Sequence, residues 1–173
     1  MAHNSPVSVS EHKTAAPATV RVFVLTVSDT RTAATDTSGR AIAELLSVAG
    51  HHVAGTAIEP DEPARVAELV RQQAAVGDVD AIITTGGTGL TSRDSTFEAI
   101  DGLLTKRLPG FGELFRMLSY EDIGAAAMMS RACAGSIGRI VVIALPGSEK
   151  AVRLAMTKLV VPELTHLVQQ VRK

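Results

Sequence analysis

The chain has 173 residues, of which 46% are hydrophobic, so it can bury the core of one generous domain. The chain has 17 Lys and Arg against 18 Asp and Glu, and only 3% of its residues are aromatic. A nucleic-acid-binding protein needs an excess of basic residues and aromatic rings for stacking, so the composition argues against this class. Binding of a small anionic ligand remains possible. The single cysteine, Cys133, excludes an internal disulfide and favours a reduced, cytoplasmic protein, and the longest apolar run, residues 140–145, is too short to enter a membrane as a span.

The chain is predicted to begin with a leader over residues 1–19. This stretch is rich in Ser, Thr, Ala and Pro and has no apolar run, so we expect neither a signal peptide nor an anchor. A single domain is then expected over residues 20–173. It opens with an apolar run over residues 20–27 that is typical of a buried parallel strand.

Helices and strands are predicted to alternate after this first strand. Apolar residues recur with a helical period up to Gly50, which suits a helix C-cap. A strand is expected over residues 52–58, a helix over 63–75 with proline in its first turn, and an apolar strand over 79–85. The alternation predicts an α/β fold, a three-layer sandwich with a mostly parallel central sheet flanked by helices.

The elements after residue 94 follow a less regular pattern. Ser95 and Glu98 match a capping box that opens a helix, and residues 108–119 predict a turn and a short helix. The small residues over 125–138 predict a helix end and a short hairpin. A fourth core strand over 139–145 then leads into one long helix over residues 149–171, which its proline, Pro162, is expected to bend.

Three strand-to-helix junctions carry residues suited to binding an anion. In open α/β sheets the ligand lies beyond the carboxyl ends of the strands, beside helix N-termini, so we expect all three to face one side. The junctions contain Ser28 and Asp29, then Thr85, Gly86, Gly87, Thr88 and Gly89, and finally Pro146, Gly147 and Ser148. The glycine loop fits neither the Rossmann fingerprint nor the P-loop, and glycines in such turns also serve purely conformational needs.

Two aspartates follow strand ends, Asp61 after the second strand and Asp94 after the glycine loop. Either could serve merely as a helix N-cap. Local sequence favours other caps, because Pro63 at the first helical position makes Glu62 the cap, and Ser95 begins the next helix. Two carboxylates beside phosphate-binding loops suit Mg²⁺, which takes one or two carboxylates and completes its shell with phosphate and water.

Five segments occur together in one order: VSDTR, TTGGTGLTSRD, LPGFGELFRMLS, SRACAG and ALPGS. Their combination resembles the MoaB/MogA family of molybdenum cofactor biosynthesis, and its detail is closer to the MoaB branch. The resemblance runs from about residue 20 to the C-terminus. It implies the fold of that family and molybdopterin adenylyltransferase activity, in which molybdopterin and ATP, with Mg²⁺, give adenylyl-molybdopterin and pyrophosphate.

The resemblance also implies roles for particular residues. Asp61 and Asp94 would be the functional carboxylates and hold Mg²⁺ directly or through water, and the glycine-loop amides would cradle phosphate. The pterin phosphate region would include Ser130, Arg131 and the turn over residues 146–148. A homo-oligomer, trimer or hexamer, is implied as well, with other molybdenum cofactor biosynthesis proteins as further partners.

Two alternatives remain at this point. Because the MoaB branch includes members without adenylyltransferase activity, the chain could be a non-catalytic molybdopterin-binding or assembly protein that uses the same pocket. A pyrophosphatase of the related CinA type is disfavoured by the residues that follow the glycine loop.

Overall fold

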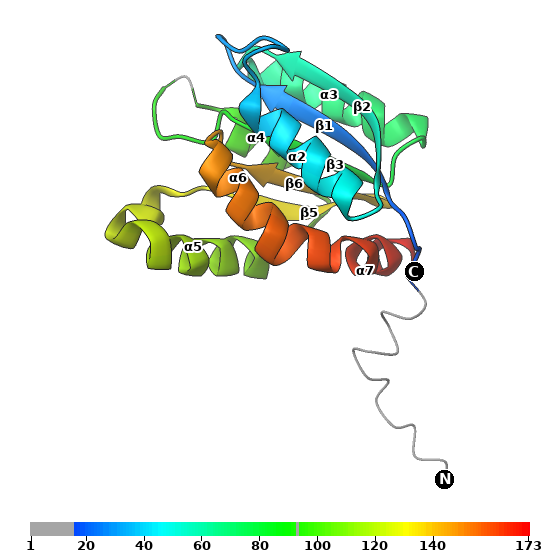
Figure 1. Cartoon of the computed structure of the whole chain (residues 1–173). Coiled ribbons are helices and arrows are strands. Elements are labelled where there is room, and N and C mark those ends of the chain that lie inside the picture. Colours follow the sequence, from blue (N-terminus) through cyan, green and yellow to red (C-terminus); the bar gives the residue numbers. More distant parts are fainter. Residues whose placement is uncertain (1–15, 93) are drawn as a thin grey trace.

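A six-stranded sheet forms the centre of the molecule (Figure 1). The computed structural model describes residues 16–92 and 94–173, so the leader expected over residues 1–19 lies mostly outside the described residues. In sheet order the strands are β2 (His52–Glu59), β1 (Arg21–Val27), β3 (Ala81–Thr85), β6 (Ile140–Leu145), β5 (Cys133–Ile137) and β4 (Lys106–Arg107). The first four are parallel, and β5 and β4 are antiparallel to their neighbours, which confirms the mostly parallel sheet.

Helices cover both faces of this sheet. They are α2 (Thr37–Val48), α3 (Pro63–Val76), α4 (Thr96–Leu103), α5 (Pro109–Ile123), the 3₁₀ helix η1 (Gly124–Met129), α6 (Glu149–Ala155), the π-helical η2 (Met156–Val160) and α7 (Val161–Arg172). Figure 1 shows α2, α6 and α7 in front of the sheet and α3 and α4 behind it. The expected three-layer sandwich is therefore confirmed.

Two hydrophobic cores hold the layers together, one on each face of the sheet. Because successive side chains of a strand point to opposite faces, Val22 and Val24 of β1 belong to the first core and Phe23 and Leu25 to the second. The first core receives side chains from α2, α5, α6 and α7, and the second from α3 and α4. The central strands are thus buried on both faces, which explains their continuous apolar sequences.

The ends of α2 and the hairpin between β5 and β6 follow local rules. Asp36 caps α2 by accepting a hydrogen bond from the Gly39 amide at 2.9 Å. Gly50, just beyond the helix, has a φ of 81°, as expected for its predicted place at the C-terminal end. The hairpin predicted within residues 125–138 forms differently: only β5 comes from that stretch, and it pairs with the core strand β6, with Ile137 opposite Ile140 and Gly138 at a φ of 56° in the turn.

Two details of the second half differ from the sequence prediction. The capping box is wrong: Ser95 is the N-cap of α4 but makes no side-chain capping hydrogen bond, and the Glu98 side chain pairs with Arg131. The helix predicted as short, α5, has 15 residues and continues into η1.

The C-terminal helix is continuous from α6 to α7 but changes its winding on the way. The π-helical η2 directly precedes α7, and Pro162 lies in the first turn of α7. A proline has no N–H to donate and its ring crowds the preceding turn, so a locally widened winding accommodates it. No helix within the described ranges is long and apolar enough to cross a membrane.

Candidate active site

The carboxyl ends of four parallel strands meet at one edge of the sheet. Thr85 at the end of β3 is in register with Thr26 of β1 and with Leu145 of β6, and Val27 is opposite Glu59 of β2. The connections that follow these strands therefore leave the sheet side by side. This confirms the expectation that the three predicted junctions face one side.

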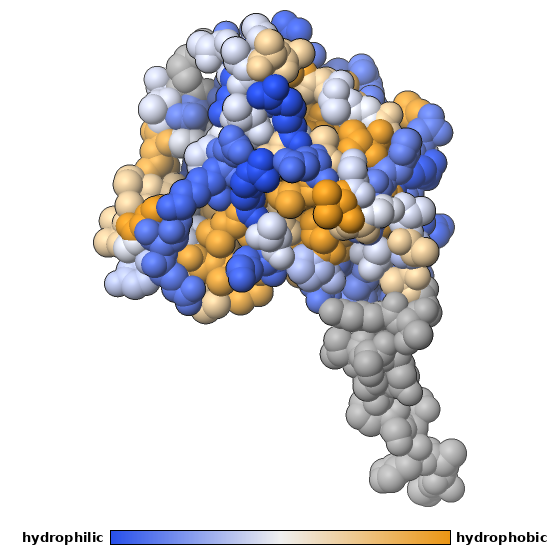
Figure 2. All heavy atoms as spheres, in the orientation of Figure 1, coloured by the Kyte–Doolittle hydropathy of each residue, from blue (hydrophilic) through white to orange (hydrophobic). Residues whose placement is uncertain are grey.

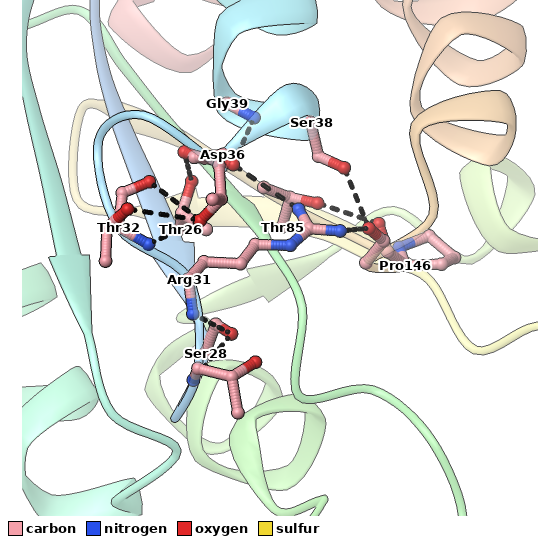
Figure 3. Close-up of polar contacts among 12 residues, drawn as sticks. Thr26, Ser28, Arg31, Thr32, Asp36, Ser38, Gly39, Thr85 and Pro146 are labelled. Carbon is pink, nitrogen blue, oxygen red and sulfur yellow. Dashed lines mark hydrogen bonds and ion pairs between the residues drawn. The ribbon is translucent and has the colours of Figure 1, made fainter.

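A partly buried hydrogen-bond network, centred on Arg31, joins the first junction to the third (Figure 3). Arg31 donates to the Gly147 carbonyl oxygen at 2.8 Å and pairs with the Asp36 carboxylate at 3.3 Å. The Ser38 hydroxyl donates to the same carbonyl at 2.8 Å, and the Thr26 hydroxyl donates to Asp36 at 2.6 Å. The loop after β1 is thus fixed to the turn after β6.

Sequence reasoning gave no role to Arg31 or Asp36. The signal was present in the VSDTR segment, where an arginine directly follows a strand end, and in an aspartate three residues before a helical glycine. Ser28, by contrast, was predicted as a substrate contact. Its hydroxyl oxygen accepts hydrogen bonds from the amides of Thr30 and Arg31 at 3.3 and 3.1 Å, so it shapes the same loop.

The glycine loop requires glycine at two positions for conformational reasons. Gly86 and Gly87 have φ values of 102° and 63°, in the left-handed region that other residues rarely adopt. A Cβ on Gly86 would lie 2.1 Å from the Val27 carbonyl oxygen, and one on Gly147 would lie 3.3 Å from the Gly86 Cα. The loop therefore packs closely against the connections on both sides, and the Thr85 hydroxyl strengthens this by donating to the Pro146 carbonyl at 2.8 Å.

The structure brings Asp61 to the start of the same loop. Its Oδ1 accepts a hydrogen bond from the Thr96 hydroxyl at 2.9 Å, and its backbone amide donates to Asp29 Oδ1 at 3.1 Å. A Cβ on Gly87 would lie 2.6 Å from Asp61 Oδ2, so the bare glycine backbone allows this carboxylate to approach. The predicted residues Asp29, Asp61 and Gly87 are thus neighbours.

Asp94 lies against the other end of the loop. A Cβ on Gly89 would lie 2.6 Å from Asp94 Oδ2, and the same oxygen accepts hydrogen bonds from the Thr91 hydroxyl at 2.5 Å and the Thr91 amide at 3.0 Å. The Thr91 hydroxyl is the main reason that the pKa of Asp94 is held below its ordinary value. At neutral pH this carboxylate is therefore charged.

The sequence predicted that Asp61 and Asp94 are not helix N-caps, and the structure confirms this. Glu62 occupies that position in α3 and Ser95 in α4. Among residues 16–92 and 94–173, no group of three or more His, Cys, Asp and Glu side chains could hold a metal ion. The two carboxylates instead flank a glycine loop, which is the donor set expected where a substrate phosphate completes the coordination of Mg²⁺.

Arg131 braces the glycine loop from the side of α4. Its Nε donates to the Thr88 carbonyl oxygen at 2.8 Å, and its other nitrogens bond to the Gly89 carbonyl and pair with Glu98. The guanidinium also lies over the Phe97 ring, 4.8 Å from its centre. Its donors hold the backbone of the loop in place.

Ser130 and Arg131 are neighbours in the sequence and were predicted to act together, but the structure places them at different sites. Ser130 lies instead on a small cavity of about 120 Å³ that it shares with Pro146 and Ser148. Ser148 also caps α6 by accepting a hydrogen bond from the Ala151 amide at 3.3 Å. The pterin phosphate residues expected from the sequence thus fall into two places, one at the glycine loop and one beside the turn after β6.

Comparison with known proteins decides the family. A family profile described as "Probable molybdopterin binding domain" matches residues 23–166. A Bacillus subtilis protein named "Molybdenum cofactor biosynthesis protein B" is 53% identical over 167 residues, covering 96% of this chain and 98% of the relative. The chain belongs to the molybdenum cofactor biosynthesis protein B (MoaB) family.

Solved structures agree with this assignment. A crystal structure of a molybdenum cofactor biosynthesis protein B superimposes with a TM-score of 0.88 at 51% identity, covering 91% of this chain and 98% of that one. The tungsten cofactor synthesizing protein MoaB from Pyrococcus furiosus gives 0.80 at 39% identity, with coverages of 91% and 100%. A MogA structure gives 0.78 at 30% identity, covering 87% and 99%. The higher identities to MoaB proteins confirm the branch that the sequence indicated.

Proposed function

We propose that this MoaB-family chain transfers AMP from ATP to the terminal phosphate of molybdopterin, giving adenylyl-molybdopterin and pyrophosphate. The observation that supports this most is the placement of Asp61 and Asp94 against Gly87 and Gly89 of one loop, at the edge where the parallel strands end. Two carboxylates beside a bare glycine backbone suit a reaction between two phosphorylated substrates. Open α/β sheets in general bind ligands beyond the carboxyl ends of their strands.

The reaction needs positioning and charge neutralisation more than a covalent nucleophile. A terminal phosphate oxygen of molybdopterin attacks the α-phosphorus of ATP, and the bond from that phosphorus to the bridging oxygen breaks. Pyrophosphate leaves with the bonding electrons. The backbone amides of Gly86, Gly87 and Gly89 would cradle phosphate oxygens, while Arg131 and the Arg31 network keep the surrounding loops rigid.

The residues present fit the magnesium ion that this chemistry requires. Asp61 and Asp94 would hold the ion, directly or through water, because both carboxylates lie beside the glycine loop. The ion would neutralise charge on the reacting phosphates. Hydrogen bonds from Thr96 and Thr91 orient the two carboxylates before any ligand arrives.

The proposal is tested by pyrophosphate release from purified protein with molybdopterin, ATP and Mg²⁺. We expect release by the wild type and its loss in Asp94→Asn. Asp78→Asn is the matched control, because Asp78 is exposed and precedes β3 at the opposite end of the sheet. Release no higher than in a protein-free control would overturn the enzyme, and retained molybdopterin binding would then identify the non-catalytic alternative.

A homo-oligomer, trimer or hexamer, is part of the same proposal. Large apolar side chains are exposed together on and beside α5 and η1, namely Leu108, Leu114, Met117, Tyr120, Ile123, Met128 and Met129. Figure 2 shows apolar residues on this side of the molecule, at its left edge. Contiguous apolar surface of this kind marks an interface, and symmetric copies of one chain are its commonest occupants.

Light scattering tests the oligomer directly against the monomer mass of 18.1 kDa. Met117, 54% exposed within the patch, is replaced by Glu, which should lower the mass. Val48→Glu is the control, since Val48 is 82% exposed on α2, outside the patch. A wild-type monomer would contradict the proposal.

A further inference from the structure

A larger cavity lies at the opposite end of the sheet from the candidate active site. Its volume is about 690 Å³, and it lies where the last turns of α3 meet the β5–β6 hairpin and the C-terminal end of α7. Figure 1 shows this end of α7 beside the start of β1, away from the connections that follow the parallel strands. Small-molecule sites in proteins have volumes of about 300–1,000 Å³, so the cavity is large enough for a ligand. The reaction proposed above gives it no role.

The lining of this cavity combines arginines with an apolar wall. Arg71, Arg139 and Arg172 line it together with the buried side chains of Val79 and Ile140, and two alanines and two glycines leave the space open. None of the described residues that line it is Asp or Glu. Guanidinium groups bind carboxylates and phosphates through parallel N–H donors. Three of them around one apolar wall therefore favour an anion that has a carbon framework.

Arg172 is fixed in place by Asp80. The Asp80 side chain is 8% exposed and pairs with Arg172 as well as with Arg21, whose Nη2 donates to Oδ1 at 2.8 Å. One carboxylate thus lies between two guanidiniums, so its charge offsets only one of them. Asp78, a second acid near Arg21, is exposed, and water screens its charge. Because Arg172 is already oriented, a ligand would lose less side-chain entropy in contacting it.

The other two arginines of the lining are held more loosely. Arg71 Nη1 lies 3.8 Å from Glu68 Oε2, and the two side chains are 58% and 60% exposed, so this pair is weak. Arg139 Nη2 donates to the backbone carbonyl oxygen of Arg172 at 3.1 Å, which is a neutral acceptor. A guanidinium has five N–H donors, so both side chains have further donors for a ligand.

We propose that this cavity is a binding site for an organic anion with two or more carboxylate or phosphate groups, held by Arg71, Arg139 and Arg172. Arg71 belongs to α3, Arg139 to the turn of the β5–β6 hairpin and Arg172 to α7. An anion with several charged groups can contact arginines of different elements at once, while its carbon framework lies against the apolar wall. Binding would connect the three elements and stabilise the folded chain.

Calorimetric titration with citrate and with inorganic tripolyphosphate, in the absence of molybdopterin and ATP, tests the site. We expect the wild type to bind at least one probe, and Arg71→Gln and Arg139→Gln each to weaken that binding about fivefold or more. Both variants keep the Asp80 pairs, so they should fold. A preference for citrate or for tripolyphosphate distinguishes a carboxylate ligand from a phosphate ligand.

Arg153→Gln is the matched control. It removes the same charge from an arginine that is 43% exposed on α6, beyond the other end of β6, and it should bind the probes as the wild type does. Three results would overturn the proposal: no binding of either probe by the wild type, wild-type affinity in Arg71→Gln and Arg139→Gln, or an equal loss in Arg153→Gln. The titration needs no turnover, so its outcome is independent of the pyrophosphate assay.

Discussion

Replacing Arg131 by Met should loosen the glycine loop while keeping most of the apolar volume of the side chain. The Arg131 side chain is 20% exposed, and its guanidinium bonds to two loop carbonyls, pairs with Glu98 and lies over Phe97. A hydrogen bond from a charged donor contributes about 1.5–3 kcal/mol when buried, and less where water can replace it. The pair with Glu98 adds little, because the Glu98 side chain is 60% exposed. We therefore expect Arg131→Met to lower the free energy of unfolding by about 2–3 kcal/mol.

Urea denaturation followed by far-UV circular dichroism measures this loss. Arg107→Met is the matched control, because Arg107 also pairs with an aspartate and bonds to a backbone carbonyl but is 54% exposed on the edge strand. Its effect should be much smaller. Arg131→Lys should restore only part of the stability, because its ammonium group keeps the charge but cannot form the same fork of hydrogen bonds.

The same variants test whether the brace matters for chemistry. In the pyrophosphate assay, Arg131→Met should lower kcat more than it raises the KM for either substrate, because a misplaced loop reduces stabilisation of the transition state. If Arg131→Met unfolds at the wild-type urea concentration and keeps the wild-type kcat, the reasoning about this brace is refuted.

Three further predictions concern the loop, the acid stability and the cysteine. Gly86→Ala should lower the free energy of unfolding by about 2–4 kcal/mol, because this position combines a positive φ with a clash against a β1 carbonyl oxygen. Gly50→Ala is the control, because Gly50 has a positive φ but open space around it, and it should lower the free energy of unfolding by about 1 kcal/mol. Urea denaturation measures both losses, and equal losses would contradict the clash. Burial alone would raise the pKa of Asp80, but hydrogen bonds and charges from Arg21 and Arg172 outweigh it and hold the pKa below its ordinary 3.8. The stability from charged Asp80 is therefore present above that pH and is lost as the pH falls through the lower value of the folded state. Asp80→Asn should thus be less stable than the wild type by about 1–3 kcal/mol at pH 7, and the difference should shrink as the pH falls below 3.8. A difference independent of pH would oppose this. Burial raises the pKa of the Cys133 thiol to about 12, so a thiol reagent at pH 8 should react with it roughly a hundredfold more slowly in the native protein than in denaturant. Rapid labelling of the folded chain would contradict that environment.

The sequence alone determined the class of fold, because the patterns that predict strands and helices lie within short segments of the chain. Continuous apolar runs predict strands buried on both faces, and helical periods between them predict the covering helices. The parallel sheet, and the position of the predicted site residues at the carboxyl ends of its strands, therefore follow from the sequence alone. Asp61 and Asp94 could be separated from ordinary N-caps for the same reason, since Pro63 and Ser95 mark the helix starts themselves. The family resemblance rested on the joint order of short segments.

The tertiary structure decided which distant residues are partners. Arg31 and Gly147 are 116 positions apart and Arg131 and Thr88 are 43 apart, and no local pattern relates them. The capping box does not form, and Glu98 pairs instead with an arginine that arrives from beyond α5. Such pairs depend on how the helices pack against the sheet, which the periodicity of each segment does not specify.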